Sequence, residues 1–180
     1  MSSPRDERAT GTIVQELLAS SSYATDYVRW CDGTQDWAGH WARLGKLPFP
    51  DDSLLAPNGG FVQLPAAEFL SAYRATGAEV TRQGGTRAFD VAVDSGNVRV
   101  AMGVKLYRGS NTQEWELRVH RGEERVEVGS MAGYARAIIL ASIGTDILYP
   151  KVAAVSRSQL AVTSREVVAT LRGLAAAFPA

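Results

Sequence analysis

The alternation of apolar and polar positions is strongest in the middle of the chain. Between residues 88 and 128, apolar side chains recur at every second position and turn-forming clusters separate the runs, which predicts an antiparallel meander. Glu79–Arg82 is the expected first strand, and the polar residues between the apolar ones predict one solvated face. The apolar positions are Phe89, Val91, Val93, Val98, Val100, Met102, Val104, Leu106, Trp115, Leu117, Val119, Val126 and Val128.

Before this meander, apolar residues recur at helical spacing. Ile13, Val14, Leu17 and Leu18 form an apolar stripe behind a capping-box pair, Thr12 and Gln15. A second face places Tyr23, Tyr27, Trp30 and Cys31 at i, i+4, i+7 and i+8, and we interpret it as core. Just before the meander, Pro65, Glu68 and Gly77 predict a helix of three turns.

After the meander, apolar residues again recur at helical spacing. Ser130 is a candidate cap for a helix whose shared face runs from Met131 to Ser142. Residues 144–162 have no clear pattern. Thr163 and Glu166 have capping-box spacing and predict the start of the last helix. Its apolar stripe is Val167, Val168, Leu171, Leu174, Ala175 and Phe178.

These elements predict a single α+β domain over residues 1–180, with residues 1–10 as a disordered tail. We expect an antiparallel four- to five-stranded meander with N-terminal helices, a helix before the sheet and two C-terminal helices packed on one sheet face. Residues 33–64 are the least regular stretch and contain several prolines, a composition typical of functional or mobile segments.

Composition narrows the class of protein. The 180 residues balance 19 Lys and Arg against 19 Asp and Glu, and they contain one Cys. This favours a cytoplasmic protein and gives no reason to expect a nucleic-acid or membrane partner. The excess of Arg over Lys and the many alanines are typical of GC-rich bacterial genomes. Residues 130–180 depart furthest from neutrality, at +3, and widely spaced basic groups of this kind usually lie on solvated faces.

Candidate catalytic groups are few. The two histidines, His40 and His120, lack metal-ligand spacing, and no phosphate-binding glycine motif is present, so neither a metal nor a cofactor is expected. Asp36 and His40 would be i, i+4 neighbours on a short helix, where the carboxylate could orient the imidazole as a general acid or base. Gly39 weakens that helix.

Aromatic residues suggest where a ligand could bind. Trp37 and Trp41 flank His40, and a sheet that curled round a cavity would line it with Met102, Trp115 and Leu117. The competing interpretation is that the two tryptophans anchor an irregular segment to the core. The sequence therefore leaves catalysis open.

Two functional hypotheses follow. The favoured one is a non-enzymatic binding or regulatory protein, self-associating or holding a protein partner through a sheet face or a terminal helix. The alternative is an enzyme or carrier for a small apolar or aromatic ligand. In that case Asp36 and His40 would be catalytic, and Trp37, Trp41, Met102, Trp115 and Leu117 would bind the ligand.

Overall fold

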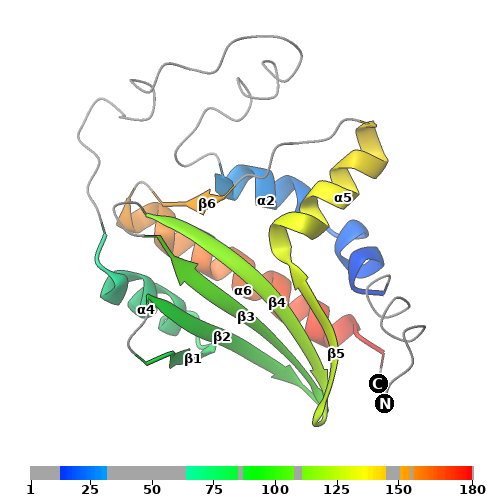
Figure 1. Cartoon of the computed structure of the whole chain (residues 1–180), viewed down its shortest axis with the longest axis horizontal. Coiled ribbons are helices and arrows are strands. Elements are labelled where there is room, and N and C mark those ends of the chain that lie inside the picture. The colour runs from blue at the N-terminus through cyan, green and yellow to red at the C-terminus, as the bar shows by residue number, and fades with distance from the viewer. Residues whose placement is uncertain are drawn as a thin grey trace.

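A six-stranded antiparallel sheet organises the molecule, as the computed structural model shows (Figure 1). The structure describes residues 13–31, 64–84, 87–107, 111–144, 151–154 and 156–179. The sheet order is β1-β2-β3-β4-β5, and the short β6 pairs with the start of β4 on the side that β5 occupies further along. The strands are β1 (Glu79–Arg82), β2 (Ala88–Ser95), β3 (Val98–Leu106), β4 (Thr112–Arg121), β5 (Glu124–Ser130) and β6 (Val152–Ala153). The predicted α+β class and meander are confirmed.

The alternating residues separate into a buried inner face and a polar outer face. Val91, Met102 and Leu117 are in register across β2, β3 and β4, and none of them is exposed to solvent. Between them on the strands lie polar or small residues that point to the other side. In the described ranges every helix lies on or beside the inner face, so the outer face carries no helical layer (Figure 1).

The long C-terminal helix α6 (Arg157–Ala177) lies along the inner face and contacts β2 and β3. Its predicted stripe from Val167 to Phe178 is buried. The predicted start at Thr163 is wrong, because Thr163 lies inside the helix and is 3% exposed. The cap is Ser156, whose hydroxyl accepts a hydrogen bond from the backbone N–H of Gln159 at 3.1 Å. Ser156 and Gln159 have the same spacing as a capping box, so the pattern occurs twice and the earlier one begins the helix.

Two N-terminal helical segments and α5 cover the β4–β5 end of the sheet. Residues 13–19 are helical, and α2 (Tyr23–Cys31) buries Tyr23, Tyr27, Trp30 and Cys31, which confirms the predicted core face. The helix α5 (Met131–Ile143) follows β5 directly and packs against α2. Tyr23 fixes this pairing, because its hydroxyl donates to the Met131 carbonyl at 2.5 Å.

The helix α4 (Ala66–Arg74) packs beside α6 and β1. Pro65, the predicted first helical residue, is instead its N-cap, so α4 begins one residue later than predicted, and Gly77 follows it with a positive φ of 76°. The buried side chain of Asn111 joins α4 to β6, because it accepts from the Leu64 N–H at 2.7 Å and donates to the Ala154 carbonyl at 2.8 Å. Since β1 is the edge strand, α4 and β1 lie together at one edge of the sheet, next to α6.

Candidate functional site

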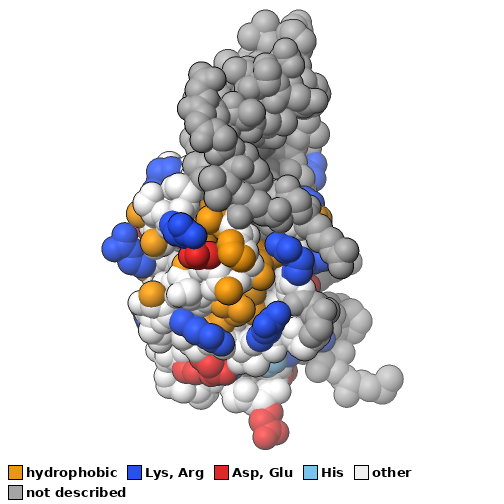
Figure 2. Space-filling view, turned by 90° about the vertical axis from the view of Figure 1, so that its left-hand side faces the viewer, with side chains coloured by type: hydrophobic (Ala, Val, Ile, Leu, Met, Phe, Trp, Pro, Cys, Tyr) orange, Lys and Arg blue, Asp and Glu red, His pale blue; other side chains and the backbone are white. Residues whose placement is uncertain are grey.

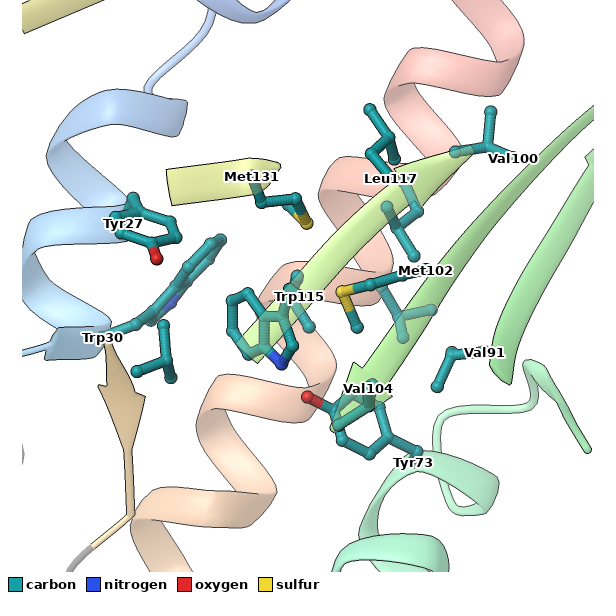
Figure 3. Close-up of a cluster of buried hydrophobic side chains, with 14 of the residues drawn as sticks. Tyr27, Trp30, Tyr73, Val91, Val100, Met102, Val104, Trp115, Leu117 and Met131 are labelled. Atoms are coloured by element: carbon teal, nitrogen blue, oxygen red, sulfur yellow. The ribbon is translucent and has the colours of Figure 1, made fainter. Parts of the chain in front are cut away.

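The sheet residues that were expected to line a ligand cavity lie in the packed core. Met102 and Leu117 are completely buried and Trp115 is 3% exposed. The Trp115 ring makes edge contacts with Tyr27 and Trp30, with ring centroids 6.2 Å and 5.7 Å apart (Figure 3). The Trp115 ring therefore fills space between the sheet and α2.

The other expected site residues, Asp36, Trp37, His40 and Trp41, lie outside the described residues. The catalytic pair and its neighbouring tryptophans consequently remain predictions. Across the described ranges, no group of three or more His, Cys, Asp and Glu side chains is placed to hold a metal ion. Nor does this part of the chain include a helix with the length and hydropathy needed to cross a membrane.

Arginine side chains cover the outer face of the sheet. Arg118 on β4 reaches across β3 to form an ion pair with Asp90 on β2. Gly103 makes this possible, because a Cβ on that residue would lie 3.0 Å from Nη2 of Arg118. The guanidinium also lies 3.6 Å from the Glu116 carboxylate, so it sits between two acids.

A second arginine bridge crosses the neighbouring strand. Arg99 on β3 contacts Asp94 on β2 at 2.9 Å and Glu79 on β1 at 2.8 Å. The outward-facing Ala92 and Ala101 are only 4% and 9% exposed, although no described helix lies above them. Both arginines therefore pair across strands, Arg99 with Glu79 and Asp94 and Arg118 with Asp90.

A depression with a volume of about 440 Å³ lies on this outer face. Ala88, Gly103, Lys105 and Glu116 are among the residues that line it. It is open to solvent, and Arg118 in its lining already pairs with Asp90.

Positive charge gathers on a different surface, beginning with α6. Arg157, Arg165 and Arg172 are all exposed. They are eight and seven residues apart, which places them within about 80° of one another around the helix. Arg157 pairs with Glu68 of α4 at 3.0 Å, and Arg172 donates to the Thr76 carbonyl at 2.9 Å. These contacts show that this side of α6 faces α4.

Two further arginines extend this surface across α4 and β1. Arg74 is the last residue of α4, and Arg82 is the last residue of β1. The side chain of Arg82 points to the same face of the sheet as that of Val80, which is the face where α4 lies. Both are exposed. We call the five residues the arginine face: Arg74, Arg82, Arg157, Arg165 and Arg172.

The arginine face has an apolar centre. Ala67 on α4 and Ala75, which follows the helix, are exposed, and Ala66 and Val80 are partly buried against the core. Figure 2 looks onto the side where α4 and β1 lie and shows hydrophobic side chains in the middle, with Lys and Arg side chains around them. This arrangement of an apolar centre and a charged rim is typical of protein-binding surfaces.

The balance of charge on the arginine face is strongly positive. Among the described residues, Glu68 is the acid within it, so five arginines and one glutamate leave a formal charge of +4 on a chain whose total is zero. Glu79 points to the outer face, where it holds Arg99. No carboxylate in the described part of the chain lies within ion-pairing distance of Arg74, Arg82 or Arg165.

The sequence indicated part of this surface. The +3 charge of residues 130–180 included Arg157, Arg165 and Arg172, which were interpreted as a solvated face. Their near-helical spacing was the available signal. Arg74 and Arg82 lie in other elements, and only the packing of α4 and β1 beside α6 brings them to the same side.

The chain was compared with protein-family models, with curated proteins and with solved structures, and none of the three comparisons found a match.

Proposed function

We propose that this is a non-enzymatic binding protein that holds a protein partner on the arginine face. The supporting observation is the net charge of +4 around an apolar centre, on a chain whose total formal charge is zero. On the outer face, by contrast, Arg99 and Arg118 are paired with carboxylates of the fold. Arg74, Arg82 and Arg165 instead leave their charge available to a partner.

The physical role of such a surface is recognition and steering. Individual exposed ion pairs contribute only about 0.2–1 kcal/mol, so specificity comes from several charges acting together and from the apolar centre that they surround. A positively charged patch also raises the association rate of a negatively charged partner, and added salt reduces this effect. The partner is therefore expected to present acidic groups.

Site-specific photo-crosslinking in the native host tests this proposal. A benzophenone amino acid replaces Ser71, an exposed residue on α4 between Ala67 and Arg74. The matched control places it at Glu123, exposed in the β4–β5 turn. We expect a discrete protein adduct from position 71 that is absent from position 123.

Charge-reversal variants test whether the adduct depends on the arginine face. Arg74→Glu with Arg165→Glu should abolish the adduct from position 71, whereas Arg125→Glu, an exposed arginine on β5, should leave it unchanged. An adduct that persists in the Arg74→Glu and Arg165→Glu variant, or an equal adduct from position 123, would contradict the proposal.

A further inference from the structure

We propose that the partner segment is an extended acidic strand that adds to the free edge of β1. This inference rests on the proposed function and specifies how the arginine face would be occupied. β1 is at the end of the sheet order, and within the described residues no strand pairs with its second edge. Strand addition to a free edge is an established way for a sheet to bind a peptide, because the main chain of the edge strand supplies the hydrogen bonds.

The register of β1 identifies the groups that would bind. The Gln83 N–H donates to the Ala88 carbonyl of β2 at 3.1 Å, so Gln83, Thr81 and Glu79 direct their main-chain groups towards β2. The N–H and C=O groups of Val80 and Arg82 consequently point away from β2. An incoming strand would find two donors and two acceptors along this short edge.

The side chains of β1 determine which sequence fits. The side chains of Val80 and Arg82 point to the inner face of the sheet, next to α4 and Arg74, whereas those of Glu79 and Thr81 point to the outer face. An added strand places alternate side chains on these two faces. Acidic residues at alternate positions would meet Arg74 and Arg82, and neutral residues between them would avoid repulsion from Glu79.

The opposite edge of the sheet is less suited to this role. β5 contains a register shift opposite Val119 and His120, and such a bulge disrupts regular pairing. Its exposed Glu124 would also repel an acidic strand. β1 has a continuous register with β2 over its four residues and carries Arg82 at its end.

An extended polypeptide also fits this surface better than a nucleic acid does. The main-chain groups of Val80 and Arg82 match those of a strand, and the apolar centre consists of Ala66, Ala67, Ala75 and Val80. Single-stranded nucleic acids bind largely by stacking bases on aromatic side chains. The aromatic residues of α4, Phe69 and Tyr73, are completely buried.

Amide hydrogen exchange followed by NMR tests the inference on the whole protein. The probe is a blocked eight-residue peptide of alternating Glu and Thr at saturating concentration. Exchange of the Val80 and Arg82 amides should slow by about fivefold or more, because these N–H groups gain acceptors. The Thr81 amide already faces β2, so it should change much less. A peptide of alternating Lys and Thr should have no effect.

A charge-reversed variant and an oligonucleotide complete the experiment. Arg74→Glu with Arg82→Glu should abolish the slowing of exchange, and Arg125→Glu should not. If the Glu–Thr peptide shifts the resonances of Arg74 and Arg165 without slowing the Val80 and Arg82 amides, strand addition is wrong and the arginine face remains a binding surface. If the peptide does not bind while the arginine-dependent adduct from position 71 exists, the acidic strand is wrong. Tighter binding of a single-stranded oligonucleotide would overturn both the strand and the protein partner.

Discussion

The phenol ring of Tyr134 occupies the space where a side chain on Gly129 would begin. A Cβ built on Gly129 would lie 2.6 Å from Cζ and 2.7 Å from Cε2 of Tyr134. The hydroxyl of Tyr134 donates to the Glu127 carboxylate on the same strand, so the ring is held across β5 at the beginning of α5. Burial raises the pKa of Glu127, and the hydrogen bond from Tyr134 offsets only part of that rise.

Replacing Gly129 with Ala should therefore destabilise the fold. The new methyl group would force the Tyr134 ring away from β5 and weaken its contact with Glu127, at a cost of about 1–3 kcal/mol, typical of overpacking. Urea unfolding measures this change in the free energy of unfolding. The same substitution in a Tyr134→Ala background should cost much less. An equal cost in both backgrounds would show that the ring is not the obstacle.

Gly173 provides the opposite case. It lies exposed in the C-terminal part of α6, and apart from its chain neighbours and the adjacent helix backbone no atom lies within 4 Å of the position that its Cβ would occupy. Because glycine lowers helix stability, Gly173→Ala should stabilise the protein by about 1 kcal/mol. Urea unfolding would reveal this as a higher midpoint with an unchanged slope. A loss of stability would mean that residue 173 needs a conformation or a contact that α6 does not show.

The contact between α2 and α6 should depend on pH through Glu166. Its carboxylate accepts from Trp30 Nε1 at 2.7 Å and pairs with Arg29 at 3.0 Å. Burial raises the pKa of Glu166, but the hydrogen bonds from Arg29 and Trp30 outweigh burial and lower it overall from 4.5. The unfolded chain then binds this proton more readily, so the stabilisation is present above pH 4.5 and is lost as pH falls further.

Glu166→Gln should remove that part of the acid dependence. The wild-type midpoint of urea unfolding should fall more steeply than that of the variant as pH decreases below 4.5. Glu16→Gln, on the exposed face of the first helical segment, should follow the wild type. If Glu166→Gln and the wild type changed in parallel, the carboxylate would not be linking protonation to stability.

The arginine bridges on the outer face should show measurable coupling. Arg118 and Asp90 are partly buried, with side chains 24% and 28% exposed, so their ion pair is screened less than a fully exposed one. A double-mutant cycle with Arg118→Ala and Asp90→Ala should give a coupling energy of about 1 kcal/mol. The same cycle with Arg118→Ala and Asp94→Ala should give almost none, because Asp94 pairs with Arg99. Equal coupling in the two cycles would contradict the assignment of partners.

The fold could largely be predicted because its elements are set by local patterns. Alternation from Phe89 to Val119 defined the central strands, and the stripe from Val167 to Phe178 defined α6. The start of α6 was missed because Ser156 and Thr163 carry equivalent capping signals, and only tertiary packing buries Thr163. The two-residue β6 is too short to produce any periodicity.

The arginine face could not be predicted in the same way. Arg74, Arg82 and Arg165 come from α4, β1 and α6, and no local pattern indicates that these elements lie side by side.

The place of Trp115 could not be decided from the sequence either. An aromatic residue on an apolar strand face suggests a ligand wall as well as a core position, and the packing of Tyr27 and Trp30 against it determines its place in the core.

Arginine-specific chemical footprinting tests whether another protein covers the arginine face in the cell. Phenylglyoxal modification is measured by mass spectrometry on the purified protein and on the protein in fresh native extract. We predict that Arg74, Arg82 and Arg165 are modified several-fold more slowly in the extract, while Arg125 reacts at the same rate in both. Equal modification of the arginine face in the two samples would contradict the proposed protein partner.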